Sequence, residues 1–176
     1  DLQVNLWNYI VMSTKTIILL TIGFLVMLFG MAFLATKGQV PTPDKREYSK
    51  EENDRPKAEV KENFKDIGEM KVDEIKEVSF SLKNIGNKPL QILNINSSCN
   101  CTFGKVLYKD VETKQFGMHK QSGYVTDIAP NDTATVKVIY NPSIMPIYGN
   151  VSRDVYITTN DPENSKLIFT LKTFVK

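Results

Sequence analysis

Two cysteines separated by one residue are the side chains of this sequence best suited to chemistry. Cys99 and Cys101 flank Asn100 in the stretch SCNCT. They could be reduced structural residues, with one packed inward and the other outward. They could also form a disulfide if the backbone bends, because positions i and i+2 of a straight strand lie near the upper limit of Cα separation for that bond.

A third role for the pair is binding a soft metal ion. Two thiolates suit Cu(I), and Met118 and His119 are an adjacent pair of soft donors further along the chain. This set, Cys99, Cys101, Met118 and His119, is the candidate copper site, and it requires the segment that carries Met118 to fold back onto the cysteines. The residue types leave the structural role, the disulfide and the metal site open.

The sequence contains no other arrangement of residues that is typical of a catalytic site. The single histidine, His119, has no neighbouring motif to orient it as a general base. There is no glycine-rich phosphate loop and no C-x-x-C pattern. The formal net charge of +2 gives no electrostatic basis for binding nucleic acid. We therefore expect a protein that is not an enzyme and that holds no cofactor, copper excepted.

Residues 16–35 form an uncharged apolar run of twenty residues, TIILLTIGFLVMLFGMAFLA. As a helix it would span about 30 Å, which matches the hydrocarbon core of a bilayer. A signal peptide is the rival interpretation, but its apolar region usually has only about 7 to 15 residues. The run therefore predicts a transmembrane anchor, and Gly23 and Gly30 could allow close packing against another helix.

Charge dominates the residues after the apolar run. We expect 1–15 to be an N-terminal flank and 36–60 to be a charged linker, since a segment so rich in both signs of charge cannot bury a core. Basic residues are also more numerous after the helix than before it. Taken alone, the positive-inside rule would place the C-terminal part in the cytoplasm.

Apolar and polar residues alternate with the period of strands through most of residues 61–176. The pattern is clear at Val78–Leu82, Ala134–Tyr140 and Leu167–Leu171, and turn residues separate these runs. A change of parity after Ile92 indicates a β-bulge. About seven strands in one domain predict an all-β, immunoglobulin-like sandwich behind a single transmembrane helix.

Four short motifs occur in order within this domain. They are Asn84-Ile85-Gly86-Asn87-Lys88-Pro89-Leu90, Ser98-Cys99-Asn100-Cys101-Thr102, Ile128-Ala129-Pro130-Asn131 and Thr158-Thr159-Asn160-Asp161-Pro162. Together they resemble the bacterial domain of unknown function 1573, an immunoglobulin-like domain of the Hydin type. Asn100 and Asn131 stand where that family usually has glycine, and asparagine tolerates the same left-handed backbone angles. The connection between Thr102 and Ile128 is longer than the family pattern and could form a hairpin near Lys109–Lys114 or near Gly117.

The resemblance implies an exported protein, with the domain in the periplasm and the helix in the bacterial cytoplasmic membrane. We expect an accessory subunit of a membrane complex that binds other subunits. The alternative is a thiol- or copper-handling assembly factor for a periplasmic metalloenzyme, acting through the two cysteines. The expected partner contacts lie on the helix and in the long connection: Gly23, Gly30, Tyr108, Phe116, Met118 and His119.

Overall fold

The structure is a computed structural model that describes residues 14–36, 44–119 and 123–176. The chain divides into two compact units, Asp1–Thr42 and Pro43–Lys176, which are described separately here. Most of the expected N-terminal flank lies outside the described residues. Its last two residues, Thr14 and Lys15, form the start of the helix.

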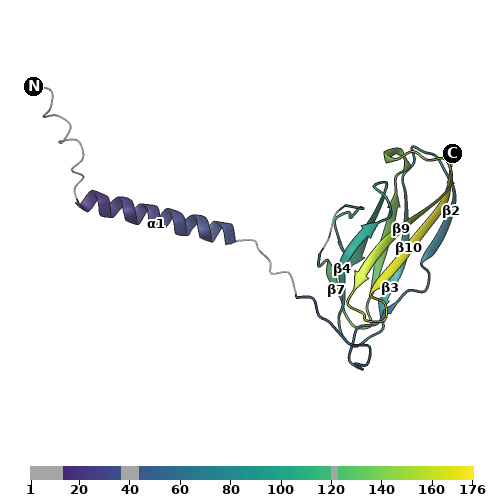
Figure 1. Cartoon of the computed structure of the whole chain (residues 1–176), viewed down its shortest axis with the longest axis horizontal. Coiled ribbons are helices and arrows are strands. Elements are labelled where there is room, and N and C mark those ends of the chain that lie inside the picture. The colour runs from purple at the N-terminus through teal and green to yellow at the C-terminus, as the bar shows by residue number, and fades with distance from the viewer. Residues whose placement is uncertain (1–13, 37–43, 120–122) are drawn as a thin grey trace, which may run out of the picture. The chain divides into compact units, whose positions relative to one another are not determined.

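The described residues of the first unit, 14–36, form one helix, α1 (Thr14–Thr36) (Figure 1). The stretch Thr14–Leu34 is long and apolar enough to cross a membrane. The hydroxyl of Thr21 donates to the carbonyl oxygen of Ile18 at 2.9 Å, so this polar group is satisfied within the helix. The predicted apolar helix is confirmed.

The regular secondary structure of the second unit is almost entirely strand. Their bounds are β1 (Ala58–Glu59), β2 (Phe64–Met70), β3 (Lys76–Asn84), β4 (Leu90–Ser97), β5 (Thr102–Tyr108), β6 (Val111–Glu112), β7 (Thr126–Ile128), β8 (Thr133–Tyr140), β9 (Gly149–Thr159) and β10 (Lys166–Val175). One short 3-10 helix, η1 (Pro142–Ile144), lies between β8 and β9.

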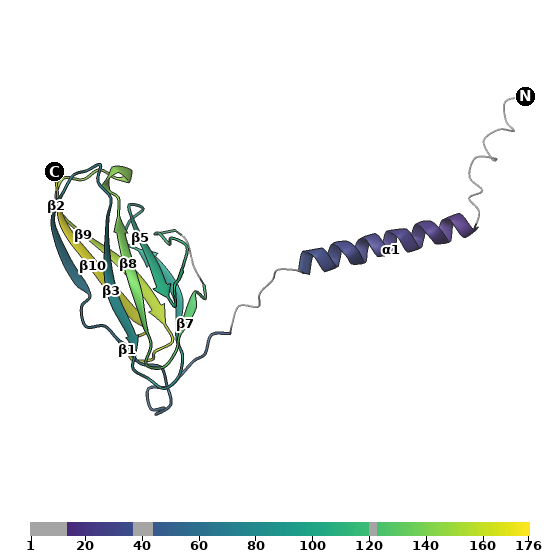
Figure 2. The ribbon, with the colours of Figure 1, turned by 180° about the vertical axis from the view of Figure 1, so that it is seen from behind.

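These strands form two sheets that pack face to face (Figure 2). The first sheet has the order β1-β3-β8-β5-β6, and the second has the order β2-β10-β9-β4-β7. The opening segment of the domain contributes to both sheets, because β1 pairs antiparallel with β3 while β2 pairs parallel with β10. The predicted immunoglobulin-like sandwich is confirmed.

The core lies between the two sheets and is made from the inward positions of the alternating strands. Phe80 of β3 and Phe169 of β10 meet across it with ring centroids 5.3 Å apart. The other large residues that are almost completely buried include Met70, Leu82, Leu90, Ile92, Ile95, Ile128, Tyr140, Ile157 and Leu171. Alternation along each strand therefore supplies one apolar face per sheet.

Local backbone geometry bears out several details of the sequence pattern. Lys109 and Asp110, both with positive φ, form the turn of the β5–β6 hairpin, as predicted for Lys109–Lys114. The register of β4 against β9 shifts after Ile92, which is the predicted bulge. Asn131 has a φ of 65°, so it takes the left-handed conformation of the glycine that it replaces. Asn100 does not share this conformation.

Residues 44–57 differ from the expected solvated linker. They belong to the second compact unit and make hydrogen bonds and ion pairs with the sandwich. Pro56 and Ala58 are buried, and the guanidinium of Arg55 reaches Glu163. Composition could not reveal these contacts, because the charge of Arg55 is paired with Asp161 and Glu163, more than a hundred residues further along the chain.

Candidate functional site

The two cysteines lie in the connection from β4 to β5, at one end of the sandwich. They form a disulfide with a Cα separation of 5.3 Å. Cys101 is completely buried in the core, whereas Cys99 is partly exposed. The chain turns at residues 99–101, which provides the backbone bend that such a disulfide requires.

The sulfur of Cys99 accepts two hydrogen bonds. The backbone N–H of Cys101 lies 3.3 Å from it. The hydroxyl of Thr102 lies 3.2 Å from it and must be the donor, because a disulfide sulfur carries no hydrogen. Thr102 is itself buried, so its hydroxyl is held in place. Cys99 is therefore the accessible and polarised sulfur of the pair.

The long connection folds back beside the cysteines. Phe116 and Gly104 of β5 exchange backbone hydrogen bonds of 2.8 and 3.0 Å. This bridge places the next residues against the cysteine turn, around a hollow of about 260 Å³. The hollow is lined by Asn100, Phe103, Gln115, Gly117, Met118 and His119.

The structure brings the four candidate copper ligands into one region but does not assemble them as a metal site. Met118 and His119 share the hollow with Asn100, between the two cysteines. The cysteine sulfurs are bonded to each other. Within the described ranges, no group of three or more His, Cys, Asp and Glu side chains is placed to hold a metal ion.

Two of the expected partner contacts are used inside the domain instead. Phe116 is only 3% exposed and packs into the core. The hydroxyl of Tyr108 donates to Asp132 at 2.6 Å and accepts the N–H of Ala129 at 3.1 Å, so it fixes the turn before β8. Sequence reasoning assigned both to a partner because apolar residues in an insertion can serve either purpose.

The remaining expected contacts are exposed. Met118 and His119 lie at the surface of the hollow. Gly23 and Gly30 are exposed on α1 with open space where a Cβ would stand. Exposure is compatible with partner contact at these four residues but does not test it, so their role stays a prediction.

Sequence reasoning missed a group of exposed apolar side chains, which we name the apolar cap. Its four residues occupy the connection between β8 and β9 and are Ile144, Met145, Ile147 and Tyr148, exposed by 48, 47, 47 and 68%. Residues 142–150 carry no charge and include two prolines, a signal that could have revealed the cap.

The backbone of the apolar cap is held in place. The side chain of Asn141 caps η1 by accepting the N–H of Ser143 at 3.2 Å, and Pro142 is the first residue of that helix. Strand register brings two further exposed apolar residues to this end, because Ile75 precedes the Lys76–Tyr140 pair and Phe174 pairs with Asn150. Because this loop is already ordered, burying the cap side chains against a partner would carry little entropic cost from ordering the loop.

The clearest shifts of pKa occur in surface ion pairs away from these features. On the outer face of the first sheet, the ammonium of Lys137 lies between the carboxylates of Glu112 and Glu77, at 2.7 and 3.3 Å. Hydrogen bonds from Lys137 and Lys105 lower the pKa of Glu112, and the hydrogen bonds to Glu112 and Glu77 raise the pKa of Lys137. This cluster is solvated, and ion pairing explains its shifts.

The topology and the site define an immunoglobulin-like sandwich domain with a short disulfide and a long added connection. A family model described as protein of unknown function (DUF1573) matches residues 58–175. The chain belongs to that family, as its four sequence motifs indicated. No curated protein matches the sequence.

Two solved structures align with this chain at low sequence identity. A protein of unknown function from Porphyromonas gingivalis W83 aligns with a TM-score of 0.51 and 15% identity, over 68% of this chain and 46% of that one. The chain thus spans less than half the length of that protein. The PapD-like domain 7 of human CEP192 aligns with a TM-score of 0.47 and 12% identity, over 78% of this chain and 97% of that domain.

Proposed function

We propose that this protein is a membrane-anchored binding module without catalytic activity, acting as an accessory subunit of a larger membrane complex. Helix α1 would hold it in the bacterial cytoplasmic membrane, and the sandwich would lie in the periplasm. The observation that carries the proposal is the apolar cap. Exposed apolar clusters on a folded domain mark surfaces that bind other proteins or membranes.

The build of the cap favours a protein partner. Its side chains project from a connection with two prolines and a capped 3-10 helix, so little conformational freedom is lost when they are buried. Aromatic and large aliphatic groups on a rigid backbone are the usual centre of a protein interface. Tyr148, the most exposed of the four, would be the central contact.

Two observations support the periplasmic side. Disulfides persist in oxidising compartments such as the periplasm, and the cysteines of this domain are bonded to each other. Membership of the family supports the same side, because its members are typically exported. The basic residues that follow α1 oppose it, but a long folded domain can be translocated regardless of such charges.

The first test replaces two residues of the cap by serine, Ile147→Ser with Tyr148→Ser. Both side chains are exposed, so the fold is expected to survive while the contact is lost. The full chain would be purified from its native membrane in mild detergent. We expect it to elute as a stoichiometric complex, and the double variant to elute alone.

The matched control is Val111→Ser in the β5–β6 hairpin, which removes an apolar side chain that is 70% exposed outside the cap. We expect this variant to retain the complex. The proposal fails if the unaltered chain elutes alone, or if the double variant keeps its partners as well as the control does.

A second candidate function, thiol handling at Cys99 and Cys101, is favoured by the hydrogen bonds to the Cys99 sulfur. In the exchange we propose, a dithiol of a partner protein would be oxidised to a disulfide while the Cys99–Cys101 bond is reduced. Two electrons and two protons would pass to the cysteine pair. When the Cys99 thiol loses its proton to water, the resulting thiolate would retain the N–H of Cys101 and the hydroxyl of Thr102 as donors. The hollow beside Asn100 would receive the partner's side chain.

The test of this function follows alkylation of the reduced full chain by mass spectrometry. We expect Cys99 to react well before Cys101, because only Cys99 is accessible. Thr102→Val should slow alkylation of Cys99 by roughly fivefold, which corresponds to one hydrogen bond of about 1 kcal/mol. Thr102→Ser, which keeps the hydroxyl, is the matched control.

Equal rates for the two thiols, or no effect of Thr102→Val in a folded protein, would contradict thiol handling at Cys99. The copper alternative has its own readout. Stoichiometric Cu(I) on the reduced chain, lost on Met118→Ala with His119→Ala, would support it, and reduced chain that binds no Cu(I) would exclude it.

A further inference from the structure

Residues 44–57, which we name the strap, connect the region after α1 to the first strand of the sandwich. Although rich in charge, the strap lies against the end of the sandwich where β4 begins and β9 ends. Two separate sets of contacts hold it there. They differ in strength, and this difference is the basis of the inference.

The first contact is made by Gln91 of β4. Its side chain is completely buried, and its carbonyl oxygen accepts the backbone N–H of Arg46 at 2.7 Å. Its amide nitrogen donates to the carbonyl oxygen of Asp44 at 3.4 Å. A buried amide must satisfy its polar atoms, and Gln91 does so largely through the strap backbone. No charged side chain takes part in these two bonds.

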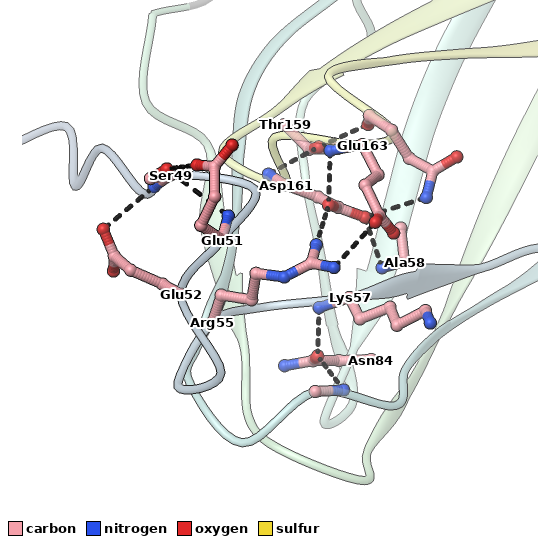
Figure 3. A network of polar contacts seen from close by, with 12 residues as sticks. Ser49, Glu51, Glu52, Arg55, Lys57, Ala58, Asn84, Thr159, Asp161 and Glu163 are labelled. Atoms are coloured by element: carbon pink, nitrogen blue, oxygen red, sulfur yellow. Dashed lines mark hydrogen bonds and ion pairs between the residues drawn. The ribbon is translucent and has the colours of Figure 1, made fainter.

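The second contact is centred on Arg55 (Figure 3). Its guanidinium lies 2.8 Å from a carboxylate oxygen of Glu163 and 3.5 Å from one of Asp161. The Arg55 side chain is 14% exposed and the Asp161 side chain is completely buried. Asp161 also accepts the N–H of Ala58 at 2.9 Å, so it ties the strap to the start of β1.

Backbone contacts with the turn after β3 strengthen this second contact. The N–H of Asn87 donates to the carbonyl oxygen of Arg55 at 3.2 Å, and that of Ile85 to Lys57 at 2.8 Å. Gly86 lies between them, and a Cβ at this position would stand 2.4 Å from the Arg55 carbonyl oxygen. The turn therefore requires glycine in order to admit the strap.

Between the two contacts, the charged side chains of the strap are mostly exposed and several bond to one another. The ammonium of Lys45 lies 2.8 Å from Glu47 and holds the pKa of that carboxyl below its ordinary value. The N–H of Ser49 donates to Glu52 at 2.9 Å. The N-terminal part of the strap thus has a single buried side chain from the sandwich holding it, whereas the C-terminal part has a buried ion pair and several backbone bonds.

We propose that the strap is a two-stage spacer, which sets how far the sandwich can stand from the helix. The contact with Gln91 opens first and frees residues 44–53, while the contacts at Asp54, which bonds to Asn87, and at Arg55 keep the strap attached and the sandwich folded. The inference rests on the proposed membrane anchoring for its biological meaning. The opening of the strap does not depend on that anchoring.

Opening the first contact would more than double the distance that the chain can span between α1 and the residue at which the strap is held. From Thr36, where α1 ends, to Asp44, the chain can span about 26 Å at ~3.3 Å per residue. From Thr36 to Asp54 it can span about 59 Å on the same basis. A binding module on such a spacer could engage a partner at either distance. Pulling or partner binding would open the first contact, whereas salt would have little effect because the contact consists of hydrogen bonds to a buried neutral amide.

The test is hydrogen exchange of the full chain in detergent, followed by mass spectrometry of peptides. Gln91→Ala should speed exchange of the peptide that contains Arg46 by at least about fivefold, the effect of losing one hydrogen bond. Peptides that contain Ile85 and Asn87 should keep their protection. Gln115→Ala, an exposed glutamine at the hollow, is the matched control and should change neither region.

A second variant acts from the strap side and leaves the sandwich untouched. Arg46→Pro removes the N–H that Gln91 accepts. It should therefore speed exchange of the peptide that contains residue 46 and leave the peptides that contain Ile85 and Asn87 protected. Gly86→Ala should instead free both regions, because it expels the strap from the turn. The spacer is disproved if Arg46→Pro and Gln91→Ala leave exchange unchanged, or if they free both regions together. Retention in the membrane and co-purification test the proposed function separately.

Discussion

Replacing Asp161 by alanine is expected to lower the free energy of unfolding of the sandwich by about 3 to 5 kcal/mol, the usual cost of removing one member of a buried ion pair. Its carboxylate is completely buried and accepts three hydrogen bonds, from the N–H of Ala58, the N–H of Glu163 and the side-chain amide of Asn164. It also faces Arg55. The substitution leaves that guanidinium and three donors without this partner. Urea unfolding followed by the near-ultraviolet signal of tyrosine would measure the loss.

Two further variants separate the ion pair from the hydrogen bonds. Glu163→Ala removes the more exposed carboxylate of the same Arg55 and should cost far less, because water can replace a partner that is 42% exposed. Asp161→Asn keeps an acceptor oxygen but loses the charge, so it should fall between the two. Equal losses for Asp161→Ala and Glu163→Ala would show that burial of Asp161 does not determine the stability of this end of the sandwich.

The strands that face the core could be predicted from the sequence because one of their faces is buried and the other is solvated. β3, β8 and β10 each have one face in the core and one in water, so their residues alternate. β2 is an edge strand with a glycine of positive φ at Gly68, and only Met70 is fully buried. Such a strand is held by its parallel pairing with β10, which leaves little pattern to detect.

The candidate sites were predictable to different degrees for a similar reason. The cysteines and the hairpin at Lys109 are encoded locally, and the structure contains both a disulfide and a hairpin there. The burial of Phe116 depends on its β-bridge to Gly104. No pattern in the residues around Phe116 predicts this contact. The strap is the extreme case. Arg55 of the strap pairs with the distant Asp161. The composition of the strap is typical of a solvated linker, so it gives no sign that the segment is docked on the sandwich.

The aromatic contact between the two sheets leads to the second large effect. Phe169→Ala is expected to lower the free energy of unfolding by about 3 to 5 kcal/mol, because it leaves a cavity in a core that cannot fully collapse. Phe169 is completely buried in β10, and its ring contacts that of Phe80 in the opposite sheet at 5.3 Å between centroids. The substitution therefore removes packing from both layers.

Phe174 of the same strand provides the matched control for Phe169. It is 43% exposed on the other face of the second sheet, so Phe174→Ala should change stability by much less. Phe169→Leu keeps most of the buried volume and should recover most of the loss, to within about 1.5 kcal/mol of the unaltered protein. If Phe169→Ala and Phe174→Ala cost the same, the two rings cannot differ in burial as the sandwich requires. Equal losses would contradict the assignment of inward and outward faces along β10.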